Sequence, residues 1–196
     1  NILGPIKNKP IQLSDGTILS PSSTETRTTE GLNWKAHIEK STDDGKSWTK
    51  IPIDPKTEFD VIQPSVLVLG DDRLQILCRS RDNSVMQSFS DDNGDTWSQI
   101  TRTVLPNPNS GTDAITLSNG LHLLVYNPTV KGKNGRSKLS VALSKTGKDW
   151  QEVLSLENKK KGEFSYPAVI ESIDRKIHIS YTHNRRNIKY VVLEFN

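Results

Sequence analysis

The chain has 196 residues, of which 33% are hydrophobic and 25% are charged, and its net charge is +3. This is an ordinary globular composition, and the chain is long enough to bury a sizeable core. The mild positive charge comes without a dense Lys/Arg stripe, so we expect no nucleic-acid partner. No apolar run approaches the roughly 18 residues of a membrane span. The single cysteine, Cys78, excludes an internal disulfide and a cysteine-based metal site.

The same turn recurs three times, about once every 50 residues, and such a period indicates a solenoid or a propeller. Its copies run over residues 41–48, 90–97 and, in a shorter degenerate form, 144–150. In the first two copies an Asp stands two positions before a Gly. The carboxylate can accept backbone N–H bonds and Gly tolerates a positive φ, so the pattern predicts a tight hairpin turn. The tryptophan that closes each copy opens the next strand, where its indole can pack between sheets.

Short strands separated by turn residues follow one another along the chain, and helical periodicity is nowhere sustained. The first repeat has expected strands at 11–13, 17–20, 34–40 and 48–53, with a polar loop over 21–33. The second has strands at 61–69, 74–79, 85–89 and 97–101. The third has strands at 112–117, 121–126, 138–143 and 150–154, and the fourth at 166–170, 176–181 and 188–195.

These repeats predict an all-β protein, a single β-propeller domain over 1–196 built of four-stranded antiparallel blades. The blades are expected at about 8–54, 58–104, 108–156 and 162–196, the last without a fourth strand. A closed propeller usually completes its last blade with a strand from the far end of the chain. Residues 1–10 are interrupted by Gly4, Pro5 and Pro10, which disfavour such a strand.

We therefore expect the C-terminal four blades of a six-bladed propeller. The missing N-terminal blades would come from the same parent chain or from a second chain. A self-contained ring of four blades is the alternative.

The chemistry is expected at the end of the ring opposite the recurrent turns. Those turns join third to fourth strands, so the other end gathers the loops between second and third strands and the connections between blades. The residues expected there are Arg79, Arg81, Arg136, Arg185, Gln63, Glu25, Tyr166 and His183. Several guanidiniums at a channel mouth suit a carboxylate or sulfate that is bound bidentately. The sequence thus predicts an acidic ligand.

Here the chain resembles a known family. The recurrent turn is similar to the Asp-box of sialidases and other BNR-repeat propellers. Residues 61–81 resemble the sialidase strand pair that carries a glutamate and the second arginine of a carboxylate-binding triad, and those positions hold Gln63 and Arg79. Residues 136–144 resemble the stretch with the third arginine, here Arg136. Residues 163–167 resemble the stretch that bears the tyrosine nucleophile.

The resemblance implies a sialidase-like, glycan-active protein that holds an acidic sugar through Arg79 and Arg136. Its departures concern catalysis. Phe164 occupies the position of the nucleophile, unless the register slips by two and Tyr166 takes the role. Gln63 stands where the activating glutamate is expected, and neither Phe nor Gln offers an ionisable nucleophile or a charge to activate one. The first arginine and the acid/base aspartate would lie in the missing N-terminal blades.

Three functions remain open from the sequence. The leading hypothesis is an exo-sialidase-like glycoside hydrolase that needs no cofactor and no metal. The second is a lyase on a uronic-acid polysaccharide, in which His183 or Tyr166 takes the proton α to a carboxylate that arginine neutralises. The third is a non-catalytic carbohydrate-binding propeller, which the Gln63 and Phe164 replacements favour. The sequence leaves the compartment open, and a secreted or periplasmic location would suit a glycan-active propeller.

Overall fold

The computed structural model describes residues 2–29, 31–70, 72–132 and 134–194. Within these ranges the chain forms fifteen strands and no helix, and the strands make four antiparallel sheets. A helix long and apolar enough to cross a membrane is therefore not found among the described residues. Each of the four expected blade ranges contains at least one residue outside the described part. The prediction of an all-β protein made of small antiparallel sheets is confirmed.

The sheets are simple meanders, so each strand pairs with the next one along the chain. The first contains β1 (Ile11–Gln12), β2 (Ile18–Thr28), β3 (Gly31–Ser41) and β4 (Thr49–Pro52). The second contains β5 (Val61–Gly70), β6 (Arg73–Ser80), β7 (Ser84–Ser90) and β8 (Thr101–Pro106). The third contains β9 (Asp113–Thr116), β10 (His122–Tyr126), β11 (Lys138–Ser144) and β12 (Gln151–Asn158). The fourth contains β13 (Phe164–Glu171), β14 (Ile177–His183) and β15 (Asn187–Leu193).

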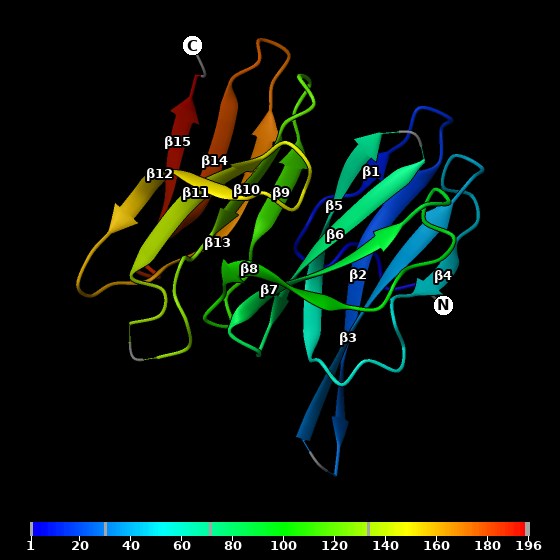
Figure 1. Ribbon diagram of the computed structural model, residues 1–196, viewed down its shortest axis with the longest axis horizontal. Coiled ribbons are helices and arrows are strands. Elements are labelled where there is room, and N and C mark those ends of the chain that lie inside the picture. Colours follow the sequence, from blue (N-terminus) through cyan, green and yellow to red (C-terminus); the bar gives the residue numbers. More distant parts are fainter. Residues whose placement is uncertain (1, 30, 71, 133, 195–196) are drawn as a thin grey trace.

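The sheets are arranged as successive blades of a propeller. Figure 1 shows them following one another across the molecule, from the blue strands on the right to the red ones on the left. Near the axis of the arc, β5 lies beside β2 and β9, and β9 lies beside β13. The first strands of the last three blades, β5, β9 and β13, therefore line a common hub together with β2 of the first blade.

Hydrophobic clusters fill the spaces between neighbouring blades. The first and second blades share a cluster that includes Ile38 and Ile76, and the second and third share one that includes Leu124. Leu123 belongs instead to the cluster between the third and fourth blades. Successive residues of a strand point to opposite faces, so β10 buries both of its faces and reads as a continuous apolar run. Full burial of each such leucine or isoleucine stabilises the fold by about 1.5–3 kcal/mol.

The recurrent turn is closed by a carboxylate, as its sequence predicts. Asp43 accepts hydrogen bonds from the backbone N–H of Ser47 at 2.8 Å and from its hydroxyl at 2.6 Å. Asp92 makes the same pair of bonds in the second copy. In the degenerate copy Asp149 closes the turn from the other side of the glycine, accepting from the Thr146 N–H at 3.0 Å. In each copy the tryptophan indole donates to a glycine carbonyl: Trp48 to Gly45, Trp97 to Gly94, and Trp150 to Gly147.

The first blade departs from the prediction, because residues 21–33 do not form a polar loop. The strands β2 and β3 instead pair from Ile18 and Ser41 as far as Thr28 and Gly31. This long hairpin projects beyond the body of the molecule in Figure 1. The segment is rich in serine and threonine, and the β-branched threonines suit a strand even without an apolar face. The loop prediction was wrong because it treated polarity as a sign of irregular structure.

Candidate functional site

Two arginines and a tyrosine from three different blades meet at the end of the hub away from the recurrent turns. Arg79 lies near the end of β6, Arg136 precedes β11, and Tyr166 lies in β13. The guanidinium carbon of Arg79 is 6.0 Å from the centre of the Tyr166 ring, and that of Arg136 is 5.3 Å from it. The structure therefore brings together these three predicted site residues.

A bulge in β13 places the Tyr166 side chain beside the two arginines. The register with β14 shifts between Ser165 and Ala168, and Tyr166 has a φ of 53°. As a result Phe164 is buried in the core between the third and fourth blades, whereas Tyr166 is 41% exposed. Bulges commonly re-aim a side chain in this way next to functional sites. The residue that contacts the arginines is thus Tyr166 and not Phe164.

Gln63 occupies a matching irregularity in β5. Its φ is 56°, and its side-chain oxygen accepts a hydrogen bond from Nη1 of Arg79 at 3.4 Å. A Cβ atom on Gly111 would lie 3.1 Å from that oxygen and 3.2 Å from Cδ1 of Tyr166. The absence of a side chain at Gly111 therefore lets Gln63 and Tyr166 converge. Sequence reasoning missed Gly111, which carries no motif signal.

The charges around Tyr166 favour its ionised form. Burial opposes ionisation, but the positive charges of Arg79 and Arg136 outweigh it and lower the pKa of Tyr166 below its ordinary value. Arg79 is largely buried, and its Nε donates to the side-chain oxygen of Asn109 at 2.8 Å. Among the described residues no carboxylate lies within ion-pair distance of Arg79. Its charge is thus available to an anionic ligand.

Arg136 is held more tightly by the protein itself. Its Nη1 lies 3.2 Å from Oε1 of Glu163, and its Nη2 donates to the Asn109 carbonyl at 2.9 Å. Glu163 also pairs with Nε of the exposed Arg185 at 2.7 Å. Burial raises the pKa of Glu163, but Arg185 and Arg136 together outweigh this effect and lower it. A cavity of about 460 Å³ adjoins this group and is lined by Glu163, Tyr166, Thr182, Arg185, Arg186, Asn187 and Ile188.

Trp34 forms a wall behind the arginines. The guanidinium carbon of Arg81 lies 3.8 Å from its ring centre, and that of Arg79 lies 5.2 Å from it. Arg81 also donates from Nη1 to Oδ2 of Asp60 at 2.8 Å, so its charge is largely compensated. Glu25 is exposed and pairs in register with Trp34, close enough to Arg79 to act on its charge. The Trp34 ring thus contacts two of the guanidiniums that were expected at this end of the hub.

His183 lies in a different cluster from the arginines. Its Nε2 is 3.9 Å from Oε1 of Glu157, and its ring centre is 5.0 Å from that of Phe164. The same carboxylate accepts hydrogen bonds from Tyr181 at 2.9 Å and from Lys189 at 2.7 Å. The described contacts of His183 thus place it in the group around Glu157, and none of them is to Tyr166.

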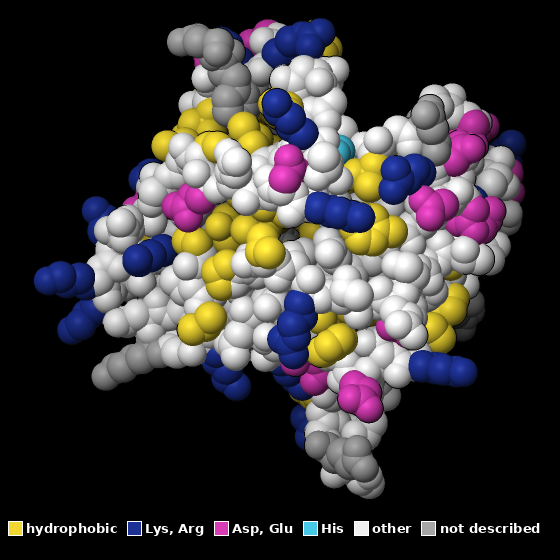
Figure 2. All heavy atoms as spheres, in the orientation of Figure 1, with side chains coloured by type: hydrophobic (Ala, Val, Ile, Leu, Met, Phe, Trp, Pro, Cys, Tyr) yellow, Lys and Arg dark blue, Asp and Glu magenta, His cyan; other side chains and the backbone are white. Residues whose placement is uncertain are grey.

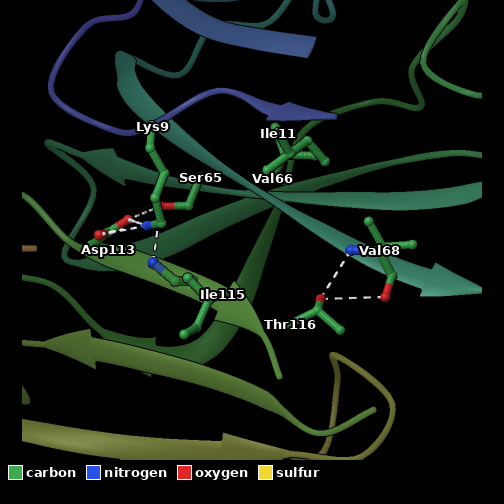
Figure 3. Close-up of a pocket in the computed structure, with 9 residues that line it drawn as sticks. Lys9, Ile11, Ser65, Val66, Val68, Asp113, Ile115 and Thr116 are labelled. Carbon is green, nitrogen blue, oxygen red and sulfur yellow. Dashed lines mark hydrogen bonds and ion pairs between the residues drawn. The ribbon is translucent and has the colours of Figure 1, made fainter. Parts of the chain in front are cut away.

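At the hub, polar groups of the chain pair with one another around a small cavity. A small cavity of about 140 Å³ lies between β5 and β9 (Figure 3) and is lined by Lys9, Ile11, Ser65, Val66, Val68, Asp113, Ala114, Ile115 and Thr116. Nζ of Lys9 lies 2.8 Å from Oδ2 of Asp113, which also accepts the N–H of Val169 at 2.8 Å. Because these polar groups satisfy one another, the cavity reads as a structural joint between blades.

The described residues hold no other centre with obvious chemistry. No group of three or more His, Cys, Asp or Glu residues within them is arranged to hold a metal ion. Figure 2 shows Lys and Arg side chains dispersed over the visible face, with Asp and Glu among them. The arrangement around Tyr166 therefore depends on a few fixed guanidiniums and not on a broad basic surface.

Comparison with known proteins gives one family match and several solved structures of similar fold. The model of the BNR repeat-like domain family matches residues 1–179. Among solved structures, the chain is similar to NanB sialidase from Streptococcus pneumoniae, with a TM-score of 0.72 and 17% identity over 94% of this chain and 30% of that one. It is also similar to the intramolecular trans-sialidase from Ruminococcus gnavus, with a TM-score of 0.69 and 19% identity over 94% of this chain and 42% of that one.

A third similar structure has no assigned activity. It is a protein of unknown function from Dyadobacter fermentans, with a TM-score of 0.77 and 15% identity over 96% of this chain and 53% of that one. A search of curated proteins by sequence finds no match. At these identities the likeness shows the fold, and the chain spans less than two thirds of each of these structures.

Proposed function

The chain belongs to the BNR repeat-like domain family, and we propose that it acts as a sialidase-like glycoside hydrolase on an acidic sugar. The observation that carries the proposal is the Tyr166 ring with the guanidiniums of Arg79 and Arg136 close to it. Fixed guanidiniums suit bidentate binding of a carboxylate. Two of the similar structures are a sialidase and a trans-sialidase, which supports a sugar with a carboxylate as the ligand.

Tyr166 is proposed as the nucleophile. With the sugar carboxylate bound across Arg79 and Arg136, the Tyr166 oxygen forms a bond to the anomeric carbon while the glycosidic C–O bond breaks. The leaving oxygen takes a proton from the acid that the family resemblance assigns to the N-terminal blades. Water then cleaves the tyrosyl–sugar bond and releases the sugar and the phenol.

Gln63 changes how the tyrosine is activated. An amide carries no charge and cannot accept the phenol proton, so the usual glutamate role is not filled by this residue. The two arginines lower the pKa of Tyr166 and supply the activation electrostatically. The hydrolase proposal therefore requires part of the Tyr166 population to ionise without a neighbouring base.

One observation favours a lyase as the second candidate. Among the described residues, no carboxylate forms a hydrogen bond with the Tyr166 hydroxyl. A phenolate held between two arginines is also a base for the proton α to the carboxylate of a uronic acid, and the same arginines stabilise the resulting enolate. The glycosidic bond at the neighbouring carbon then breaks, with its electron pair leaving on oxygen, and an unsaturated sugar forms.

The decisive experiment assays the full-length protein on fluorogenic sialosides and on uronic-acid polysaccharides. Hydrolysis releases the fluorophore, whereas elimination gives a product with new ultraviolet absorbance. The Tyr166→Phe variant is expected to lose about 10²-fold or more of either activity. Tyr190→Phe is the matched control, because the exposed Tyr190 contacts His178 on the last blade and not the arginines. Activity that survives Tyr166→Phe, or binding of acidic sugars without any turnover, would contradict the proposal.

A further inference from the structure

Residues 3–9, which we call the N-terminal strap, cross the hub and contact all four blades. The contacts to the first two blades are Leu3 N–H to Glu39 at 2.5 Å, Gly4 N–H to Glu39 at 2.8 Å, Ile6 N–H to the Pro21 carbonyl at 3.1 Å, and Asn8 Nδ2 to the Gln63 carbonyl at 2.8 Å. The contacts to the last two are Lys7 Nζ to the Thr112 carbonyl at 2.5 Å and to the Pro167 carbonyl at 2.7 Å. No strand or helix pattern predicted a role for this segment.

Two of these contacts end at the candidate site. Asn8 bonds the carbonyl of Gln63, and Lys7 bonds the carbonyl of Pro167, the residue after Tyr166. Gln63 and Tyr166 both have a positive φ, with values of 56° and 53°. A residue with a side chain is strained in this conformation, which persists only where surrounding contacts hold it. The strap supplies a contact of this kind to both residues.

Lys7 is fully engaged by carbonyl oxygens. Its Nζ donates to the side-chain carbonyl of Asn8 at 2.9 Å as well as to Thr112 and Pro167, which uses the three donors of an ammonium. Its Cε would lie 3.1 Å from a Cβ on Gly111, where Gln63 and Tyr166 also converge. Lys7 is therefore packed into the same confined space as the two irregular residues.

We infer that Lys7 is a positioning residue, whose ammonium holds the backbone after Tyr166 so that the phenol lies between Arg79 and Arg136. Its effect on turnover rests on the proposed function, but its effect on the Tyr166 ring does not. The positioning requires the charged form, because a neutral amine has only two N–H donors for three acceptors.

The charges that face Lys7 set where it titrates. Burial lowers the pKa of Lys7 to about 8; Asp113 opposes this change, and Lys9 and Arg79 add to it. Tyr166 lies close by and has a lowered pKa of its own. The hold on Tyr166 is accordingly expected to weaken as the pH rises through about 8.

The test observes the Tyr166 ring by NMR in full-length protein carrying ¹³C-labelled tyrosine, with the signal assigned by its loss in Tyr166→Phe. In the unmodified protein the signal is expected to move with a midpoint near the Lys7 pKa of about 8. In Lys7→Met it should already lie at the displaced position at neutral pH and show no such midpoint. Lys7→Gln likewise offers only two N–H donors and does not titrate, so its signal should also be displaced at neutral pH and show no such midpoint.

Lys35→Met serves as the matched control. Lys35 lies in β3 of the first blade and also donates to a backbone carbonyl, that of Thr57. Its Tyr166 signal should follow that of the unmodified protein. The inference is overturned if Lys7→Met and Lys7→Gln both leave the Tyr166 signal and its pH response unchanged. If the signals behave as expected but no turnover occurs on any acidic glycan, the inference stands and the proposed function fails.

Discussion

At the scale of single residues, Tyr166 and Phe164 are two positions apart and serve different ends. The sequence left open which of them stands beside the arginines, because a motif match cannot reveal a bulge. The bulge buries Phe164 and turns Tyr166 to the rim. Arg79 and Arg136 were predictable from their place relative to the recurrent turns. Their approach to one tyrosine depends on Gly111, whose role only the packing reveals.

This division of roles predicts that Phe164→Ala and Tyr166→Ala differ in stability. Phe164 is 2% exposed and belongs to the core between the third and fourth blades. Its truncation is expected to lower the free energy of unfolding by about 3–5 kcal/mol, measured by urea denaturation. Tyr166→Ala should change it by less than half as much, because that ring is partly exposed. Equal losses in the two variants would show that Tyr166 is a packing residue.

At the scale of elements, the turns were the most predictable feature and the first hairpin the least. The spacing of Asp and Gly in the recurrent turn specifies both hydrogen-bond acceptor and backbone conformation, so local sequence determines it. The extent of β2 and β3 depends on cross-strand pairing of polar residues, which no periodicity announces. The degenerate turn shows that Asp149 can replace the missing Asp from the opposite side of Gly147.

The turn carboxylates predict a dependence of stability on pH. Hydrogen bonds from Thr96 and Ser90, opposed by a little burial, lower the pKa of Asp92 from 3.8 to about 2. A depressed folded-state pKa contributes stability above the unfolded value, and this is lost as the pH falls from about 4 towards 2. Asp92→Asn should therefore lower Tm at pH 7 and flatten its decline in that acid range.

The control for that experiment is Asp91→Asn in the same turn. Asp91 pairs with Arg73, and both side chains are largely exposed, at 77% and 56%. Exposed pairs contribute about 0–1 kcal/mol, so this Tm should barely move. Thermal scans by circular dichroism from pH 2 to pH 7 measure both variants. A Tm of Asp92→Asn that tracks the unmodified protein at every pH would contradict the role given to this carboxylate.

Gly147 links the degenerate turn of the third blade to the second blade. Its φ is 76°, and a Cβ there would lie 2.1 Å from Oε1 of Gln75, whose Nε2 donates to the Gly147 carbonyl at 2.8 Å. Gly147→Ala is expected to lower the free energy of unfolding by roughly 1–2 kcal/mol, because alanine is strained in the left-handed conformation. It should lower it by a further amount because the new methyl group displaces Gln75. Gly16 has a φ of 89° with open space around it, so Gly16→Ala isolates the strain. Urea denaturation should rank Gly147→Ala as the less stable; the reverse order would refute the contact.

At the scale of the whole molecule, the succession of blades followed from the repeat alone. Alternating apolar strands at a fixed period leave few ways to bury both faces of a sheet, so the stacking was foreseeable. The N-terminal strap was not, because residues 1–10 show no period and include two prolines. Its contacts to every blade mean that the geometry of the rim depends on a segment far from it in sequence.

The central claim is that Arg79 and Arg136 together bind the carboxylate of a sugar. Calorimetric titration of the full-length protein with N-acetylneuraminic acid and glucuronic acid, each compared with its methyl ester, tests it most directly. At least one acid should bind at least tenfold more tightly than its ester, and Arg79→Gln and Arg136→Gln should each weaken that binding by about tenfold or more. Arg175→Gln should leave it unchanged, since the exposed Arg175 lies in the β13–β14 turn at the opposite end. Equal affinities for acid and ester, or full affinity in both site variants, would contradict the account.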